Sequence, residues 1–325
     1  MPKAAILMAT YNGEAHIAQQ LDSILQQTHT DWELYVSDDG SKDDTVKILL
    51  EYQASDKRIC EIIANPGPHG AFYNYYHLIR YLKERGKVFD YIFYCDQDDV
   101  WVQQKLEKQI ARLAACDSHK PALCNCDLAL TDGDGVLTGQ KMSDYTDLEL
   151  KNPYDLFFKH RYIWGTAMAH NRALWDMLQI PMDITNKVSH DNFLGKYAVC
   201  YGSVVYEPDP LVLYRRHGDN VSSMPVEHKL SRHFPFIHFY RYYRAVAFLS
   251  LYFVYHAPYK TPFMQEYANA VLQGGHKASR FLKKYGICVT EGILSRTVFS
   301  LLFTTGLIKR DSRIKNKEYL YEKNQ

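Results

Sequence analysis

Apolar runs alternate with segments of helical periodicity through the first third of the chain. The run 4–9 (AAILMA) is continuous, as expected of a strand that is covered on both faces. Similar runs occupy 32–36, 60–65 and 90–96, and a polar turn and a helix-like segment follow the first three runs. This alternation predicts an α/β fold with a mostly parallel, doubly wound sheet flanked by helices.

Polar turns follow all four predicted strands. They are Thr10–Glu14, Ser37–Ser41, Asn65–Gly70 and Asp96–Asp99. Sheets of this kind bind ligands at the carboxyl ends of their strands. We therefore expect the four loops to converge on one edge of the sheet and to form the ligand site there.

The fourth turn, in YIFYCDQDDVW, is strongly acidic because Asp96, Asp98 and Asp99 fall within four positions. Like charges this close repel each other and raise each other's pKa, so a positive partner is expected. The chain contains neither GxxxxGK[ST] nor GxGxxG, so a phosphate ligand must be held in another way. A divalent cation, Mg²⁺ or Mn²⁺, bridging the carboxylates and a diphosphate meets both needs. The alternative is an acidic helix start, with Asp99 capping a helix predicted at 100–114.

Three motifs, ATYNGE, SDDGSKDDT and CDQDDVW, occur in this order. In order and spacing they resemble the family two inverting glycosyltransferases of GT-A fold, and within that family the bacterial rhamnosyltransferases of cell-wall polysaccharide assembly. The resemblance covers about residues 3–222. It implies a catalytic domain at 1–225, with a donor half at about 1–115 and an acceptor half at about 116–225.

The same resemblance implies inverting transfer of a sugar, with dTDP-rhamnose as the expected donor. A UDP-hexose or UDP-HexNAc transferase is the alternative within the class. A non-catalytic nucleotide-sugar-binding scaffold is the alternative from another class. Loss of the acidic triad or of Asp191 would favour the scaffold, and neither is lost.

On the donor side, the resemblance assigns roles residue by residue. Asp39 would meet the edge of the base, Asp96 would lie near the ribose and the metal, and Asp98 would be the main metal ligand. The nucleoside pocket would be lined by Thr10, Tyr11 and Glu14. For Asp38 and Asp39 the alternative is an ordinary turn followed by a helix cap.

On the acceptor side, Gly165 and Thr166 would face the donor sugar, with His190 and Trp101 also near the sugars. Inverting transfer needs a base that deprotonates the acceptor hydroxyl as it attacks, and Asp191 is the candidate. A helix N-cap is the alternative role for Asp191, and a structural role is the alternative for His190.

The segment LVLYRRHGDNVS (211–222) resembles the family's strand end that reaches the diphosphate. Arg215 and Arg216 would neutralise charge on the leaving group, and His217 would be a further metal ligand. A solvated basic strand end is the alternative.

Charge is divided unevenly along the chain. Residues 226–325 contain 16 Lys and Arg against 6 Asp and Glu, net +10, whereas the first 225 residues contain 22 against 31, net −9. Together with the aromatic segments 233–257 and 292–310, this predicts a helical region that binds an anionic membrane surface. The uncharged stretch from 297 to 308 is too short to span a bilayer.

A helical bundle that packs on the catalytic domain, or that forms a homodimer, is the alternative for this region. The resemblance also implies a lipid-linked saccharide acceptor. We therefore expect a cytoplasmic protein, peripheral on the inner face of the cell membrane, with no nucleic acid partner. The N-terminal segment is interpreted as a first strand and not as a signal peptide. The seven cysteines are scattered, and Cys124-Asn-Cys126 lacks zinc-site spacing, so reduced thiols are expected.

Overall fold

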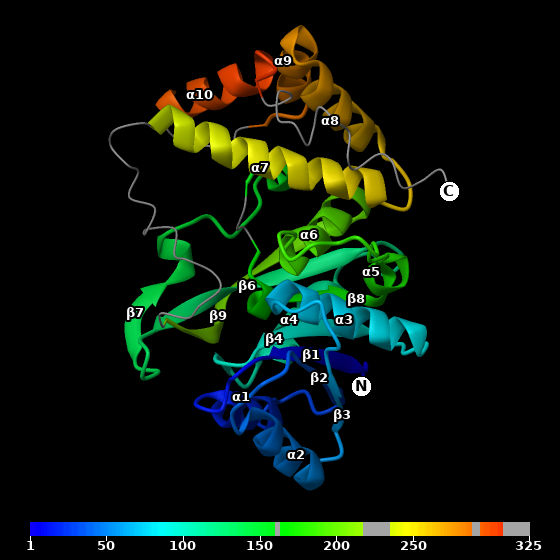
Figure 1. The fold of residues 1–325 in the computed structure, drawn as a ribbon, viewed down its shortest axis with the longest axis vertical. Coiled ribbons are helices and arrows are strands. Elements are labelled where there is room, and N and C mark those ends of the chain that lie inside the picture. The colour runs from blue at the N-terminus through cyan, green and yellow to red at the C-terminus, as the bar shows by residue number, and fades with distance from the viewer. Residues whose placement is uncertain (160–162, 217–234, 288–292, 308–325) are drawn as a thin grey trace. The chain divides into compact units, whose positions relative to one another are not determined.

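The computed structural model describes residues 1–159, 163–216, 235–287 and 293–307, and the chain divides into two compact units (Figure 1). The first unit consists of Met1–Glu149, Ile163–Ala198 and Gly202–Pro225. The second consists of Leu150–Tyr162, Val199–Tyr201 and Val226–Gln325. Residues 150–162 and 199–201, which lie within the predicted catalytic domain at 1–225, are thus part of the second unit.

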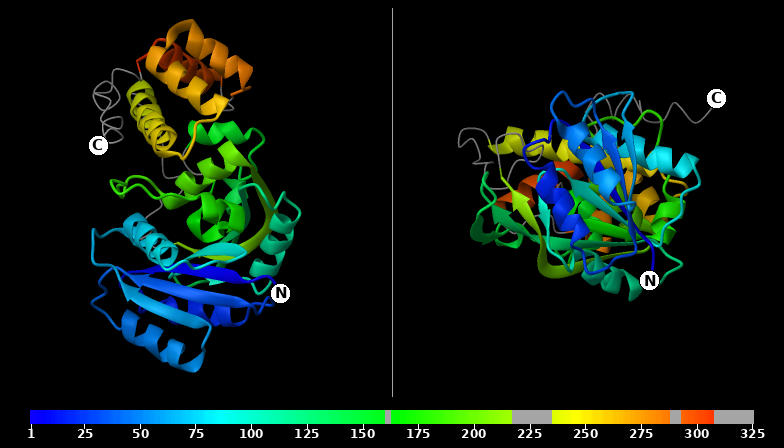
Figure 2. Two further views of the ribbon diagram at one scale, coloured as in Figure 1. Left: turned by 90° about the vertical axis from the view of Figure 1, so that its right-hand side faces the viewer. Right: turned by 90° about the horizontal axis from the view of Figure 1, so that it is seen from below.

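A twisted sheet, nine-stranded in the described part of the chain, forms the centre of the first unit (Figure 2). Its parallel half has the order β3-β2-β1-β4. The bounds of these strands are β1 Ala4–Thr10, β2 Trp32–Asp38, β3 Ile59–Ala64 and β4 Tyr91–Asp96. The predicted parallel alternation is confirmed for this half.

The other half of the sheet is mixed. Strand β8 (Met168–Asn171) lies between β4 and β6 (Ala122–Thr131) and is antiparallel to both. Strand β9 (Ser203–Arg215) runs parallel to β6 and antiparallel to the two-residue strand β5 (Val100–Trp101). Strand β7 (Leu137–Lys141) pairs antiparallel with β6.

Helices cover both faces of this sheet. The apolar sides of α1 (Ile17–Leu25), α2 (Thr45–Ser55) and α4 (Lys105–Ala114) join one core cluster with residues of β1, β2, β4 and β6. Helix α3 (Ala71–Glu84) packs on the opposite face, where the Tyr75 and Tyr94 ring centroids are 5.9 Å apart. The remaining helical segments are η1 Met142–Asp144, η3 Gly165–Ala167, α5 Arg172–Met177 and α6 His190–Tyr201.

The second unit is helical and has an aromatic core of its own. Its elements are η2 Pro153–Phe157, α7 Pro235–His256, α8 Pro262–Gln273, α9 Gly275–Lys284 and α10 Ile293–Thr304. Phe158 packs edge-on against Phe299 and Phe303, with centroids 5.5 and 5.4 Å apart. Phe158 thus supplies an aromatic ring to the middle of the bundle. In the described ranges, no helix combines the length and apolarity needed to cross a membrane.

Candidate active site

Three parallel strands end at one edge of the sheet. In the register of β1 with its neighbours, Thr10 pairs with Asp38 at the end of β2, and Ala9 pairs with Asp96 at the end of β4. Thr10 is buried, and its hydroxyl donates a hydrogen bond to Asp38 Oδ1 over 3.0 Å. The loops that follow these strands therefore start side by side, as the parallel pattern predicts.

Asp38 organises the turn after β2. Its carboxylate accepts hydrogen bonds from the backbone N–H groups of Gly40 and Ser41, at 3.0 and 2.8 Å, and from the Ser41 hydroxyl at 2.5 Å. These bonds satisfy backbone donors that a tight turn would otherwise leave unpaired. The turn role, one of the two alternatives for this residue, is the one seen in the structure.

Asp39 fixes the loop after β3. Its carboxylate accepts hydrogen bonds from Asn65 Nδ2 at 2.6 Å and from the Gly70 N–H at 2.7 Å, and it lies 2.9 Å from His69 Nδ1. Only 8% of Asp39 is exposed. Its contact with the edge of a base stays a prediction. The partners Asn65 and His69 were not identified from the sequence, because polar residues in a Pro- and Gly-rich loop give no periodic signal.

Gln97 connects the first loop to the acidic loop. Its Oε1 accepts a hydrogen bond from the Tyr11 N–H at 2.8 Å, and its Nε2 donates to the Tyr11 carbonyl at 2.9 Å. The Tyr11 side chain is exposed, and Glu14 Oε2 accepts from the Asp44 N–H at 2.8 Å. The nucleoside-pocket roles of Tyr11 and Glu14 remain predictions. Gln97 could not be singled out from the sequence, because its uncharged side chain is not part of the acidic pattern.

In the acidic loop, the carboxyl group of Asp96 has a strongly raised pKa. Burial, with the negative charge of Asp98 added, raises the pKa of Asp96 to about 7. The Tyr75 hydroxyl, which donates to Asp96 Oδ1 over 2.8 Å, opposes this rise, and the charge of Asp191 adds to it. The loop therefore concentrates negative charge where a cation would be stabilised.

Arg215 holds the acidic loop in place through hydrogen bonds. Its Nε donates to the Asp98 carbonyl at 2.9 Å, one Nη donates to the Gly133 carbonyl at 3.0 Å, and the other donates to Gln19 Oε1 at 2.5 Å. Arg215 is 3% exposed, so its guanidinium does not face a ligand. The expectation that Arg215 contacts the diphosphate is corrected: the side chain is used to hold four segments together.

Asp99 is a buried anchor and not a helix cap. Helix α4 begins at Lys105, because Val100–Trp101 form β5 before it, so Asp99 lies outside the reach of the helix start. Asp99 Oδ1 instead accepts a hydrogen bond from the Arg215 N–H at 3.1 Å. Burial raises the pKa of Asp99 well above its ordinary value.

His190, the first residue of α6, is buried between Tyr75 of α3 and Gly165 of η3. Its ring stacks on Tyr75 with centroids 4.0 Å apart, and a Cβ on Gly165 would lie 2.6 Å from His190 Nε2. Neither ring nitrogen has a hydrogen-bond partner in the described part of the chain, and burial lowers the pKa of His190 to about 3. His190 is therefore neutral, and the structural alternative for it is supported.

Gly165 and Thr166 are both buried, Thr166 completely. Gly165 borders the ring of His190. The predicted position of both residues facing the donor sugar stays a prediction. A glycine is required at position 165 because any side chain would collide with the imidazole ring.

Asp191 lies in the first turn of α6, whose N-cap is Ser189. The N-cap alternative for Asp191 is therefore wrong. Its charge acts on Asp96, so the candidate base and the acidic loop belong to one electrostatic cluster. The role of Asp191 as base stays a prediction.

Trp101 is a core residue and not a surface for sugar. It is 2% exposed, and its ring lies 6.3 Å from that of Phe93. The fully buried ammonium group of Lys105 lies 4.7 Å from the Trp101 ring centroid. The expected contact between Trp101 and sugar is corrected, because β5 directs the indole into the core cluster.

Arg216 follows β9 and is partly buried, and its N–H donates to the Thr131 carbonyl at 3.2 Å. Its contact with the diphosphate stays a prediction. His217 lies outside the described residues, so its predicted place as a metal ligand is not addressed. In the described ranges, no group of three or more His, Cys, Asp or Glu side chains could by itself hold a metal ion. The carboxylate oxygens of Asp96 and Asp98 are still the donor type that Mg²⁺ and Mn²⁺ prefer, as a partial ligand set.

The sequence profile of Glycosyl transferase family 2 matches residues 5–175, more than half of the chain. A dTDP-rhamnosyl transferase of Shigella flexneri, RfbG, is 30% identical over 223 residues, which are 66% of this chain and 72% of that protein. The chain belongs to glycosyl transferase family 2 and is a glycosyltransferase.

A second relative is WfgD of Escherichia coli, a UDP-Glc:alpha-D-GlcNAc-diphosphoundecaprenol beta-1,3-glucosyltransferase. It is 37% identical over 109 residues, which are 34% of this chain and 40% of that protein. Among solved structures, S. aureus TarS 1–349 superposes with a TM-score of 0.52 at 14% identity, covering 94% of this chain and 82% of that one. Its complex with UDP-GlcNAc gives a TM-score of 0.51, also at 14% identity, covering 94% and 83%. These similarities show the GT-A fold.

The raised pKa of Asp96 predicts a pH-dependent gain of stability in Asp96→Asn. Between about pH 4 and 7, folded Asp96 retains a proton that the unfolded chain releases, so this group destabilises the fold as pH rises through that range. With EDTA present, Asp96→Asn should therefore melt above the wild type at pH 8, and this difference should shrink at pH 5. Thermal melts at both pH values measure it. A variant that melts below the wild type at both would show that the bond from Tyr75 outweighs the charge.

The hydrogen bonds of Arg215 predict that Arg215→Lys lowers the free energy of unfolding by about 2–4 kcal/mol. Lysine cannot reproduce the fork, and each lost bond to a charged group costs about 1.5–3 kcal/mol. Urea denaturation without ligand measures the effect. Arg172→Lys is the control, because Arg172 makes an ion pair with Asp176 at 3.3 Å in which both side chains are exposed, and it should change stability by less than about 1 kcal/mol. If Arg215→Lys kept its stability but bound the donor more weakly, Arg215 would instead be assigned to contact with the diphosphate.

Proposed function

We propose that this glycosyltransferase moves rhamnose from dTDP-rhamnose to a lipid-linked saccharide acceptor, with inversion at the anomeric carbon. The observation that carries the proposal is the electrostatic cluster of Asp96, Asp98 and Asp191, in which both other carboxylates raise the pKa of Asp96. The acidic loop is suited to a cation–diphosphate pair, and Asp191 is a separate carboxylate suited to act as base. The 30% identity to a dTDP-rhamnosyl transferase supports the choice of donor.

In this proposal Asp96 and Asp98 hold Mn²⁺ or Mg²⁺, which would neutralise charge on the nucleoside diphosphate as it leaves. Asp191 takes the proton of the acceptor hydroxyl. Inversion requires this hydroxyl to attack the face of the sugar opposite the leaving group, so the base must lie on that side. His190, neutral and stacked on Tyr75, sets the position of the first turn of α6 and hence of Asp191.

The proposed acceptor is a saccharide on a polyprenyl diphosphate. Support comes from WfgD, a relative that acts on a diphosphoundecaprenol-linked sugar. We also propose that the C-terminal region, net +10 over 226–325, binds the anionic inner face of the cell membrane where such an acceptor is presented. A homodimer through the same region is the competing arrangement.

A UDP-sugar donor is the second candidate, because WfgD uses UDP-Glc and is 37% identical over 109 residues. A thermal-shift screen of dTDP-rhamnose, UDP-glucose and UDP-GlcNAc with Mn²⁺ separates the two. The true donor at about 100 times its Kd should add about 2.7 kcal/mol of stability and raise Tm by several degrees. A larger shift with a UDP-sugar than with dTDP-rhamnose would reject rhamnose as the sugar transferred.

Asp98→Ala and Asp191→Asn should both impair transfer, but only Asp98→Ala should also impair donor binding. Asp98→Ala should abolish transfer together with metal-dependent donor binding, because the main cation ligand is lost. Asp191→Asn should lower turnover by a factor on the order of 10² or more while donor affinity stays nearly unchanged, because only basicity is lost. Radiolabelled transfer and donor titration measure both. Normal turnover in Asp191→Asn would move the base elsewhere, and full wild-type activity in EDTA would reject the cation.

A further inference from the structure

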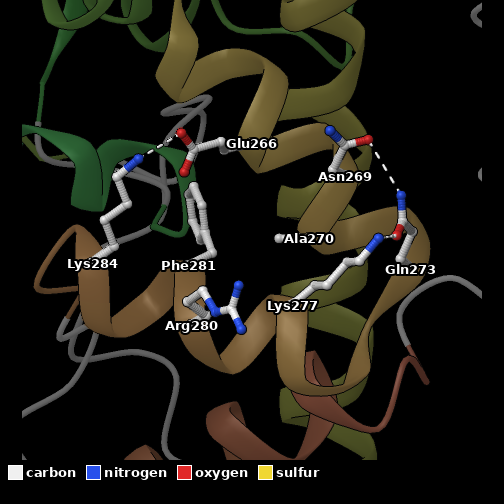
Figure 3. Close-up of a pocket in the computed structure, with 8 residues that line it drawn as sticks. All are labelled: Glu266, Asn269, Ala270, Gln273, Lys277, Arg280, Phe281 and Lys284. Atoms are coloured by element: carbon white, nitrogen blue, oxygen red, sulfur yellow. Dashed lines mark hydrogen bonds and ion pairs between the residues drawn. The ribbon is translucent and has the colours of Figure 1, made fainter.

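A cavity of about 310 Å³ lies between α8 and α9 in the second unit (Figure 3). This volume is at the lower end of the range for small-ligand sites, about 300–1,000 Å³. Ala270 of α8 leaves the floor open, since its methyl group is the smallest side chain at the middle of the wall, and Phe281 supplies an aromatic side. The site can therefore hold a compact group and contact its apolar stem.

Two polar bridges close the ends of this cavity. At one end Lys284 Nζ donates to Glu266 Oε1 at 2.6 Å. At the other end Lys277 Nζ donates to Gln273 Oε1 at 2.5 Å, and Gln273 Nε2 lies 3.4 Å from Asn269 Oδ1. These contacts occupy both lysines and the single carboxylate of the lining.

Arg280 lies between the two bridges (Figure 3). Within the described ranges its guanidinium has no hydrogen-bond or ion-pair partner, although Glu266 is in the same lining. Glu266 is paired with Lys284 instead. Arg280 is exposed, so its charge is open to an anion from solution, and the planar fork of arginine fits the oxygens of phosphate in pairs.

The residues around the cavity favour a phosphate group of an anionic bilayer over a protein as the partner. Helix α9 places its basic residues on its exposed side, while Ala278 and Phe281 are buried. The exposed basic residues are His276, Lys277, Arg280, Lys283 and Lys284. A second copy of the chain would have to bury this repeating positive charge, and lysine is depleted in the cores of protein interfaces. An anionic bilayer leaves the same charges at a hydrated boundary and attracts all of them.

We propose that the α8–α9 cavity binds the phosphate of an anionic phospholipid headgroup, with Arg280 as its direct ligand. The inference rests on the proposed membrane association of the C-terminal region and makes it specific. The headgroup phosphate would pair with the fork of Arg280, and the carbon atoms of the headgroup glycerol would lie toward Ala270 and Phe281.

The test compares Arg280→Gln with Lys283→Gln in the full-length protein. Both lose one positive charge from α9, but Lys283 does not line the cavity. Cosedimentation uses vesicles of neutral phosphatidylcholine with or without 30 mol% phosphatidylglycerol. Loss of one general surface charge weakens binding about fivefold. We expect Lys283→Gln to stay near that value, Arg280→Gln to lose tenfold or more, and Arg280→Lys to fall between them.

Equal losses in Arg280→Gln and Lys283→Gln would overturn the site, because diffuse attraction would then explain the binding. A rise in the Tm of the wild type with millimolar inorganic phosphate, while the protein shows no preference for anionic vesicles in cosedimentation, would overturn the lipid headgroup as the ligand. A change of oligomeric state in Arg280→Gln, seen by analytical ultracentrifugation, would assign the cavity to a second copy. Wild-type protein that ignores vesicle charge but still transfers sugar to a soluble acceptor would reject membrane binding and leave the proposed glycosyl transfer standing.

Discussion

The geometry of the acidic loop depends on the buried guanidinium of Arg215. A loop with three carboxylates in four positions tends to open, because its charges repel each other and gain by moving into water. Arg215 counters this from inside: its side chain holds the Asp98 carbonyl, and its N–H holds Asp99. Since its other two contacts reach Gly133 and Gln19, one side chain of β9 sets the loop relative to β6 and α1. The guanidinium of Arg215 thus acts on the backbone of the loop, at the Asp98 carbonyl.

A second constraint connects the acidic loop to the candidate base. Tyr75 uses its hydroxyl for Asp96 and its ring face for His190, whose neighbour in sequence is Asp191. The two halves of the site, far apart in the chain, are therefore related through one rigid aromatic side chain of α3. Buried rings without rotamer freedom transmit position well, because close-packed interiors resist small displacements. This arrangement also explains why a neutral imidazole is tolerated without hydrogen bonds: its partners are the faces of Tyr75 and the backbone of Gly165.

The parallel half of the sheet and the convergence of its loops could be predicted from the sequence, because buried strands and amphipathic helices have distinct periods. The position of Asp96 at the end of β4 follows from the same pattern. The directions of Arg215 and Trp101 could not be predicted, because they depend on the pairing of β5 with β9, and two-residue strands have no period. Asp99 was assigned to a helix cap for the same reason, since β5 delays α4 by five residues. Partners such as Gln97 and Tyr75 need three-dimensional contacts, which a single sequence does not encode locally.

In the second unit, aromatic side chains are largely buried and basic side chains are largely exposed. The rings expected to anchor the protein in a membrane interface are largely used inside the bundle, as Phe253, Phe263 and Phe303 are each no more than 3% exposed. What the described part of α9 offers outward is positive charge with little apolar surface to insert. Attraction of that kind is long-ranged but screened, with a Debye length of about 8 Å at physiological ionic strength. Any docking of this unit on a bilayer must therefore be shallow, reversible and sensitive to salt. Such docking would keep the enzyme near lipid-linked acceptors while leaving it able to exchange between them.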